Sequence, residues 1–411
     1  MNDLKEKYID IILKTCLKLD SNQPLLLCFN DEIMPFARMV ANRAYQMGVK
    51  DIYFDIIYPE LKHDALKSLE IKDLKNMSFW NKEIWNKYAK KNAAFLMLDS
   101  ITPDLMKDID SNKIKEMVSY ASSTRKVFKS MRDKSQLSWC IACVPTYDWA
   151  KLIFPDSNTP VDDLWNSIFD ICEIKSDNPS LEWDKKLDKL NKVTEKLNNY
   201  NFKKLKYNNS LGTDFSIELP EGHIWKSGLE KLENGKEILC NFPTEEVFTS
   251  PSYKSANGIV YSSKPLSYQG SIIDEFYIEF KDGKAISSFA KVGDKELKSM
   301  INTCKNSDYL GEVALVEYSS SISKSNIIFY ETLYDENAAC HIALGNSFPE
   351  CILDGPKMSR EELLERGLNN CDNHVDFMIG TSDLSIIGIT HDDKEIKILE
   401  NGNFTGEFKD N

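Results

Sequence analysis

The sequence predicts an α/β protein with two domains: an N-terminal doubly wound, mostly parallel sheet over residues 1–182 and a C-terminal α+β, strand-rich domain over residues 183–411. Two observations lead to this fold class. In the first part of the chain, short apolar runs alternate with helical patterns, as in parallel strands joined by helical crossovers. In the second part, short alternating strands are separated by turn residues, which favours antiparallel or mixed pairing.

The first domain contains apolar runs of strand length and amphipathic helical patterns. The runs cover residues 24–29, 51–58, 93–100 and 138–144, and the helical patterns cover 32–48, 112–130 and 161–173. The first helical pattern has an apolar stripe and ends at a glycine, as is typical of a helix; these residues are Phe36, Val40, Ala44, Met47 and Gly48. Neither a G-x-G-x-x-G motif nor a P-loop follows any of these strands, so the sequence does not favour nucleotide binding.

A charged helical pattern at residues 182–200 is expected to connect the domains, with lysines on a solvated face. The strand-like segments beyond it cover residues 208–219, 234–243, 262–287 and 386–404. Two dipeptides, at 282–283 and 401–402, are Asp-Gly and Asn-Gly. Such pairs accept positive φ at both central positions of a two-residue turn, so we expect a hairpin at each place.

Composition and charge exclude several classes of protein. The 51 Lys and Arg against 64 Asp and Glu give a net charge of −13, and no stretch gathers the basic and aromatic residues that follow a phosphate backbone, which disfavours nucleic acid as a partner. The amino terminus lacks the apolar core of a signal peptide, and no segment is apolar enough to span a membrane. We therefore expect a soluble cytoplasmic protein without membrane partners.

Ten cysteines are scattered through the chain, which favours reduced and mostly buried thiols over a disulfide scaffold. Cys140 and Cys143 form a C-x-x-C motif, but they stand in an apolar run that ends at Pro145 and has no second pair for zinc. We interpret them as structural residues of a buried strand. Two of the five histidines, His223 and His391, are expected at the surface or at the rim of a site.

Polar residues within apolar segments of the second domain point to a chemical site. Read as a strand, residues 372–380 place His374 and Asp376 on one face and apolar residues on the other. Glu312 interrupts a strand-like apolar run with no lysine or arginine nearby in sequence. Burial of an ionised carboxylate costs several kcal/mol unless a positive partner is present, and a metal ion would supply one.

A second histidine lies in residues 332–345, which we interpret as a short helix and its end. Asp335 can cap the helix, Asn337 and His341 then share one face, and Gly345 ends it. One of Glu245 or Glu246, in a further acidic segment, adds a carboxylate oxygen.

Two imidazoles and three carboxylates are too many ligands for one structural zinc, and they suit a two-metal site. Ions about 3.5 to 4 Å apart can hold a water molecule that is nucleophilic near neutral pH. The pattern therefore predicts hydrolysis of an amide, an ester or a phosphate. An acidic protein disfavours phosphate substrates and poses no obstacle to a peptide with a positive amino terminus.

Four ordered segments, at residues 241–251, 310–323, 332–345 and 374–380, closely resemble the signature segments of the thermophilic aminopeptidase family of metallopeptidases (M29). The likeness extends to residues 149–156, 212–225 and 264–270. The resemblance implies a two-domain cytoplasmic enzyme, usually a homodimer, that removes amino-terminal residues from peptides. It also implies two divalent metal ions: zinc, cobalt, magnesium or manganese.

Carried over residue by residue, the resemblance implies a set of metal ligands, with Glu312 as the bridging one: Glu246, Glu312, His341, His374 and Asp376. It also decides between Glu245 and Glu246 in favour of Glu246. Glu336 is a further ligand, a general base, or a residue that suits the start of a helix by its charge. In the implied reaction, Glu312 or Glu336 carries the proton to the leaving amine.

One position departs from the family pattern, because Phe348 stands where the family usually has a tyrosine. A tyrosine hydroxyl there can stabilise a developing oxyanion, which phenylalanine cannot do. Tyr334 is a candidate substitute. The alternative to an active aminopeptidase is therefore a catalytically weak, metal-loaded protein that binds peptides or amino acids, with Phe348 as the disabling change.

Overall fold

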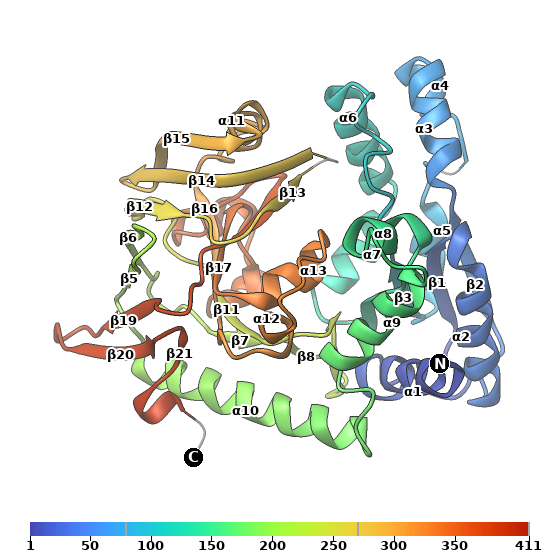
Figure 1. Cartoon of the computed structure of the whole chain (residues 1–411), viewed down its shortest axis with the longest axis horizontal. Helices are drawn as coiled ribbons and strands as arrows, with labels where there is room; N and C mark the ends of the chain where they lie inside the picture. Colours follow the sequence, from blue (N-terminus) through green and yellow to red (C-terminus); the bar gives the residue numbers. More distant parts are fainter. Residues whose placement is uncertain (79, 269–270, 410–411) are drawn as a thin grey trace. The chain divides into compact units, whose positions relative to one another are not determined.

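The computed structural model describes residues 1–78, 80–268 and 271–409, and the chain divides into two compact units (Figure 1). Unit 1 consists of Met1–Trp183 and Leu229–Pro243, and unit 2 of Asp184–Gly228 and Thr244–Asn411. The first division therefore falls one residue after the proposed domain boundary. Residues 229–243 also belong to unit 1, whereas the sequence predicts them in the second domain.

Unit 1 is built on a parallel sheet, as predicted. The strand order is β10-β4-β3-β1-β2, and every strand pairing in this sheet is parallel. The strands are β1 (Leu25–Asn30), β2 (Ile52–Ile57), β3 (Ala94–Asp99), β4 (Trp139–Cys143) and β10 (Asn241–Phe242). All residues of β1 are buried, which is expected of a central strand with helices on both faces. The pairing of β10 with β4 explains why residues 229–243 belong to unit 1.

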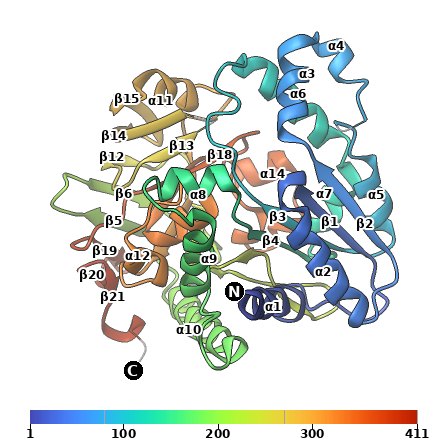
Figure 2. The same ribbon diagram turned by 45° about the vertical axis from the view of Figure 1, so that its right-hand side comes forward.

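Helices surround this sheet, and Figure 2 shows α2, α5 and α7 around β1 and β2. The helices of unit 1 include α1 (Asn2–Asp10), α2 (Met34–Gln46), α3 (Pro59–Ser68), α4 (Ile71–Leu74), α5 (Glu83–Lys90), α6 (Ser111–Ser123), α7 (Lys126–Arg132), α8 (Tyr147–Ile153) and α9 (Pro160–Ile171). In α2, the apolar stripe is buried at Phe36, Val40 and Ala44. The pattern at 112–130 forms two helices, because α6 ends at Ser123, and the hydroxyl of the next residue, Thr124, donates to the carbonyl of Ala121 at 2.8 Å.

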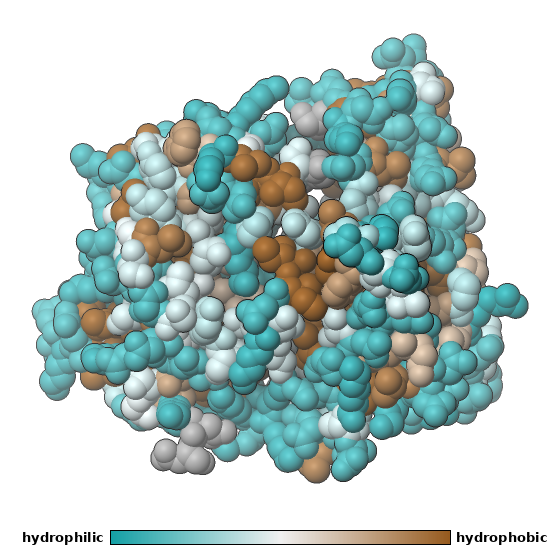
Figure 3. Space-filling view, viewed as in Figure 1, coloured by the Kyte–Doolittle hydropathy of each residue, from teal (hydrophilic) through white to brown (hydrophobic). Residues whose placement is uncertain are grey.

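The predicted connecting helix is α10 (Pro179–Tyr200), which begins three residues before the predicted start and contains the division between the units. Its apolar face, which includes Leu190, Val193 and Leu197, joins the core of unit 2. In Figure 3 the visible surface over α10 is mostly hydrophilic, as the lysines of its outer face predict. No helix in the described ranges is long and apolar enough to cross a membrane.

Unit 2 contains two larger antiparallel sheets. One has the order β18-β17-β16-β11-β7, and the other β13-β14-β12-β6-β5-β19-β20-β21 with β15 paired to β14. The strands of the second sheet are β5 (Lys204–Asn208), β6 (Asp214–Glu218), β12 (Asn257–Tyr261), β13 (Leu266–Tyr268), β14 (Ser271–Lys281), β15 (Lys284–Val292), β19 (Ser385–Ile389), β20 (Glu395–Glu400) and β21 (Asn403–Phe404). The strand-rich, antiparallel prediction is thus confirmed, although Gln269 and Gly270 of the predicted segment 262–287 lie outside the described residues.

Both predicted hairpin turns are confirmed. β14 and β15 are joined at Asp282 and Gly283, and β20 and β21 at Asn401 and Gly402. All four turn residues have positive φ, between 49° and 84°. Short helices complete unit 2: α11 (Asp294–Ile301), α12 (Ser321–Ser325), α13 (Thr332–Asp335) and α14 (Arg360–Glu365).

Candidate metal centre

Four neighbouring strands of the first sheet of unit 2 carry the predicted ligands. These strands are β11 (Glu246–Thr249), β16 (Leu310–Val316), β17 (His341–Gly345) and β18 (His374–Met378), which continue to β7 (Lys226–Ser227) at one edge. Ala343 pairs with both Glu312 and Asp376, and Gly345 pairs with His374. Because paired residues and alternate residues share a face, this register places the five side chains on one face of the sheet: Glu246, Glu312, His341, His374 and Asp376.

The position of His341 corrects the sequence analysis, which placed it on a helix. Helix α13 ends at Asp335, the turn Glu336–Ala338 follows, and Ala339 is extended at φ −162° and ψ 158°. His341 is the first residue of β17, whose five residues are all buried. A strand buried between two others reads as a short apolar run, and such a run cannot be told from a helix end by its pattern alone.

The predicted cap of this helix is also wrong. The side chain of Glu331 caps α13 by accepting from the backbone N–H of Tyr334 at 3.2 Å. Asp335 instead accepts from the N–H of Phe329 at 2.9 Å, which closes the preceding loop. Asn337 does not face the histidine, since its amide oxygen accepts from the N–H of Glu245 at 2.6 Å.

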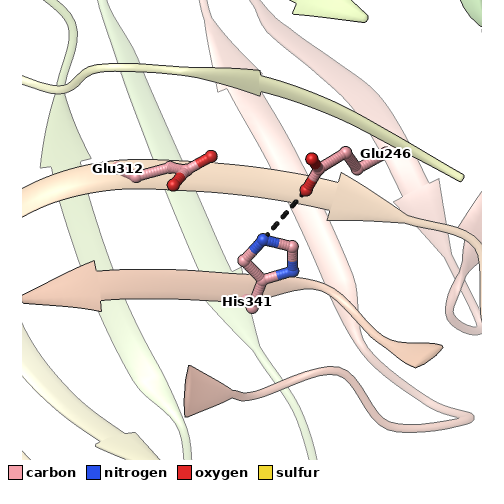
Figure 4. Close-up of side chains that lie close together, drawn as sticks. All are labelled: Glu246, Glu312 and His341. Atoms are coloured by element: carbon pink, nitrogen blue, oxygen red, sulfur yellow. Dashed lines mark ion pairs between the residues drawn. The ribbon is translucent and has the colours of Figure 1, made fainter. Parts of the chain in front are cut away.

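The five side chains form two groups of three that share one residue. Glu246, Glu312 and His341 form one group, Glu312, His374 and Asp376 form the other, and within each group one possible ligand atom per residue lies within 4.8 Å of the others. Figure 4 shows the carboxylates of Glu246 and Glu312 facing each other beside the ring of His341. Glu312 is the one residue that both groups contain.

Short contacts hold the two imidazoles against the carboxylates. Nε2 of His341 lies 3.0 Å from Oε2 of Glu246, and Nε2 of His374 lies 3.0 Å from Oε2 of Glu312 and 3.3 Å from Oδ1 of Asp376. The other ring nitrogens face backbone carbonyls: Nδ1 of His341 that of Ala339 at 3.1 Å, and Nδ1 of His374 that of Asn346 at 2.8 Å. Such a carbonyl fixes the ring and directs Nε2 to the site, as is common for metal-binding histidines.

The site concentrates negative charge. Burial raises the pKa of Glu312 to about 7, and the charges of Asp376 and Glu246 add to this effect against the hydrogen bond from His374. Burial lowers the pKa of both imidazoles, but the neighbouring carboxylates outweigh it and raise the pKa of each well above its ordinary value. Such a group of side chains attracts protons or a metal cation.

The residues present fit a divalent metal. Oε2 of Glu246 and Oδ1 of Asp376 are buried, and no donor in the described part of the chain has the geometry of a hydrogen bond to either atom. Their neighbours are the imidazole nitrogens of His341 and His374, at 3.0 and 3.3 Å. Buried carboxylate oxygens usually accept a hydrogen bond, so a bound cation would account for both atoms. Oxygen and imidazole ligands suit zinc, cobalt, manganese or magnesium.

Glu336 lies beside the site without belonging to either group of three. It stands in the turn after α13, and burial followed by the charges of Asp376 and Glu246 raises its pKa well above the ordinary value. Glu245 points elsewhere, because its carboxylate pairs with Lys186 at 3.1 Å. The two adjacent glutamates therefore have opposite orientations, as strand alternation requires.

The two residues proposed for substrate binding lie in different surroundings. The ring of Phe348 is 4.9 Å from the ring of His374 and 5.5 Å from that of Phe248, a residue that the sequence analysis did not identify. Tyr334 is fully buried and its ring lies 5.0 Å from that of Phe329. Phe348 thus lies against a predicted metal ligand.

Of the other histidines, His391 is exposed as predicted, whereas His223 does not lie at the surface, which was one of the two places expected for it. His223 is buried, its Nδ1 donates to the carbonyl of Pro220 at 3.1 Å, and burial lowers its pKa to about 4. His223 lies in a short loop between β6 and β7, where no helical or strand period signals burial.

Comparisons with known proteins extend over almost the whole chain. A family model described as thermophilic metalloprotease (M29) matches residues 1–404. Aminopeptidase 2 of Geobacillus stearothermophilus is 37% identical over 405 residues, which are 98% of each chain. Aminopeptidase AmpS of Bacillus subtilis (strain 168) is 35% identical over 399 residues, 97% of each chain. Among solved structures, wild-type AmpT from Thermus thermophilus matches with a TM-score of 0.90 at 27% identity, covering 98% of this chain and 100% of that one.

Proposed function

Because the chain belongs to the M29 family of thermophilic metalloproteases and is a metal-dependent aminopeptidase, we propose that it hydrolyses the first peptide bond of its substrates with two divalent ions. The observation that carries the two-metal proposal is the sharing of Glu312 by both groups of three ligands. The alternative of a weak binding protein is not favoured, since relatives named as aminopeptidases match along the full chain.

Each ion has its own set of residues in this proposal. Glu246 and His341 would hold one ion, His374 and Asp376 the other, and Glu312 both. When bound, such a pair polarises the scissile carbonyl and makes water nucleophilic near neutral pH. The carbonyls of Ala339 and Asn346 orient both imidazoles so that Nε2 faces the site where the ions would bind.

We assign proton transfer to the carboxylates at the site. Glu336 lies next to both groups of ligands, and its raised pKa suits a group that takes a proton and then gives it to the leaving amine. The remaining roles for Glu336 are those of a further metal ligand and of a partner for the amino terminus of the peptide. The ring of Phe348, packed on His374, would border the substrate.

Glu312→Gln tests the central role of this residue. We expect a loss of roughly 100- to 10,000-fold or more in the hydrolysis of leucyl and arginyl anilides, because the shared ligand and a candidate proton carrier are both removed. Glu317→Gln is the matched control, since Glu317 pairs with Lys189 at 2.5 Å outside the site, and its rate should stay near that of the unmodified protein. An unchanged rate in Glu312→Gln with added cobalt or zinc would reject the proposal.

Glu336→Gln separates the roles of this second carboxylate. If Glu336 carries the proton, elemental analysis should find the metal content unchanged while kcat falls and the pH profile of the rate shifts. If it is a ligand, the metal content should fall together with the rate. An unchanged rate and metal content would remove Glu336 from the site.

We also propose that the protein is cytoplasmic and homodimeric. The family resemblance supports both properties, and ten cysteines scattered through a large chain suit a reducing compartment. Light scattering during size-exclusion chromatography tests the dimer, and a monomer at micromolar concentration would contradict it.

A further inference from the structure

Two cysteines far apart in sequence have adjoining sulfur atoms in unit 2. The Sγ atoms of Cys304 and Cys371 are 2.9 Å apart, although 67 residues separate the two positions. Cys304 is half-buried and Cys371 is 6% exposed. Neither belongs to the metal groups, so their contact has no part in the proposed hydrolysis.

The backbone around this pair is fixed by hydrogen bonds between the same two segments. The amide of Asn369 donates to the carbonyl of Asn306 at 2.9 Å, and the amide of Asn306 donates to the carbonyl of Asn370 at 3.2 Å. A disulfide has an S–S bond of about 2.05 Å, so the sulfurs would need to approach by about 0.9 Å. These hydrogen bonds therefore keep the two sulfurs within about 1 Å of bonding distance.

We propose that Cys304 and Cys371 form a reversible thiol–disulfide site that small disulfides such as glutathione disulfide oxidise. Cys304 reacts first because its thiol is more exposed, whereas burial raises the pKa of the Cys371 thiol to about 12. The Cys304 thiolate attacks one sulfur of glutathione disulfide and expels one glutathione. Cys371 then loses its proton, attacks the sulfur of Cys304 and expels the second glutathione, so that two electrons and two protons pass from the protein to glutathione.

The site lies at the entry to the strands that carry metal ligands. Cys304 precedes β16 with Glu312, and Cys371 stands three residues before His374. The N–H of Cys371 donates to the side-chain oxygen of Asn346 at 3.3 Å, and the backbone carbonyl of Asn346 faces Nδ1 of His374 at 2.8 Å. A disulfide would therefore hold together the two segments leading to β16 and β18. Slower metal release in the oxidised form is a consequence that rests on the proposed function.

The direct test is equilibration of the full-length protein in glutathione buffers, followed by alkylation of free thiols and mass mapping of peptides. We expect a linked peptide pair containing Cys304 and Cys371, which disappears on reduction. The thiols of Cys16 and Cys140 are also hydrogen-bonded to each other, but both are fully buried, so they should stay reduced. Glutathione adducts at Cys304 without the link, or a link between Cys16 and Cys140 alone, would overturn the proposal.

Variants confirm the assignment and separate it from the proposed function. Cys304→Ser should abolish the link, and Cys240→Ser should not, since Cys240 is half-buried like Cys304 but its thiol donates to Glu230 at 3.0 Å. Oxidation should raise the Tm of the unmodified protein by several degrees and leave the Tm of Cys304→Ser unchanged, because the link constrains the unfolded chain. A Tm that does not rise on oxidation would overturn the stabilising role. If the disulfide forms but metal loss to a chelator is not slowed, the expected effect on metal release is contradicted, whereas the thiol–disulfide site itself is still supported.

Discussion

Each unit buries carboxylates, but the two units compensate their charge differently. In unit 1, Asp55 is 8% exposed, and its oxygens lie 2.9 and 2.8 Å from Nζ of Lys82. The indole N–H of Trp85 donates to the same carboxylate at 2.8 Å. The buried carboxylate of unit 1 is thus fully paired by side chains of its own unit.

In unit 2, three carboxylates gather at the candidate metal centre with two imidazoles: Glu246, Glu312 and Asp376, with His341 and His374. Within the described ranges, no lysine or arginine forms an ion pair with any of these carboxylates. Both arrangements are buried, so burial alone does not separate them. The difference is that unit 1 supplies its own fixed cation, whereas unit 2 leaves negative charge for a cation from outside.

The largest effect on stability is expected for Asp55→Asn. This change leaves the ammonium of Lys82 buried without its partner, and loss of one member of a buried pair costs about 3–5 kcal/mol in the free energy of unfolding. Urea unfolding measures this loss. Asp104→Asn is the matched control, because Asp104 forms an exposed pair with Lys107 at 3.2 Å and should lose little. Equal losses in both variants would show that the pair in unit 1 has no special role.

A smaller effect is expected from pH in protein freed of metal by a chelator. The pKa values of Glu312 and Asp335 are both raised to about 7, mainly by burial, whereas carboxyl groups in unfolded chains titrate near pH 4. The folded state therefore holds more protons than the unfolded state between about pH 4 and 7, so stability falls as pH rises through this window. The histidines act in the same direction above their ordinary pKa.

Urea midpoints measured with a chelator from pH 5 to 8 check this prediction. Added divalent metal should remove the part of the fall that Glu312 and the histidines cause, since it takes the place of their protons, whereas the part due to Asp335 should remain. Glu312→Gln should likewise make the fall shallower. Glu317→Gln is again the control and should leave the slope unchanged. If the metal-free protein instead becomes more stable between pH 5 and 7, the negative charge at the candidate metal centre cannot be uncompensated.

The sequence predicted most of the fold because its strongest signals are local. The runs at 24–29 and 93–100 are strands β1 and β3, and both hairpins follow from dipeptides that accept positive φ. The return of residues 229–243 to unit 1 rests on a two-residue strand, β10, which is too short to leave a pattern. The parallel pairing with β4 reveals it, together with contacts such as the ion pair of Lys236 with Asp20 at 2.7 Å.

The candidate site was predicted in its residues but not in its geometry. His374 and Asp376 show the period of two that marks one face of a strand, and β18 confirms that alternation. His341 was placed on a helix because the acidic and small residues before it resemble a helix start, whereas the helix stops at Asp335. The carbonyls that orient the rings had no signal, since any residue type at position 339 or 346 supplies one.

The smallest effect is expected for Phe348→Tyr. If the carboxylates of unit 2 and the metal ions they would bind are sufficient for catalysis, a neutral hydroxyl added beside His374 should change kcat by less than about 100-fold. This limit is the smallest contribution expected of one oxyanion donor. Phe248→Tyr is the matched control, because the ring of Phe248 packs on that of Phe348 at 5.5 Å and tests the addition of a hydroxyl to the aromatic cluster itself. Anilide hydrolysis with saturating metal measures both variants. A gain of about 100- to 1,000-fold in Phe348→Tyr alone would mean that charge without a hydroxyl donor is not enough, and that the unmodified chain is the weak binding protein.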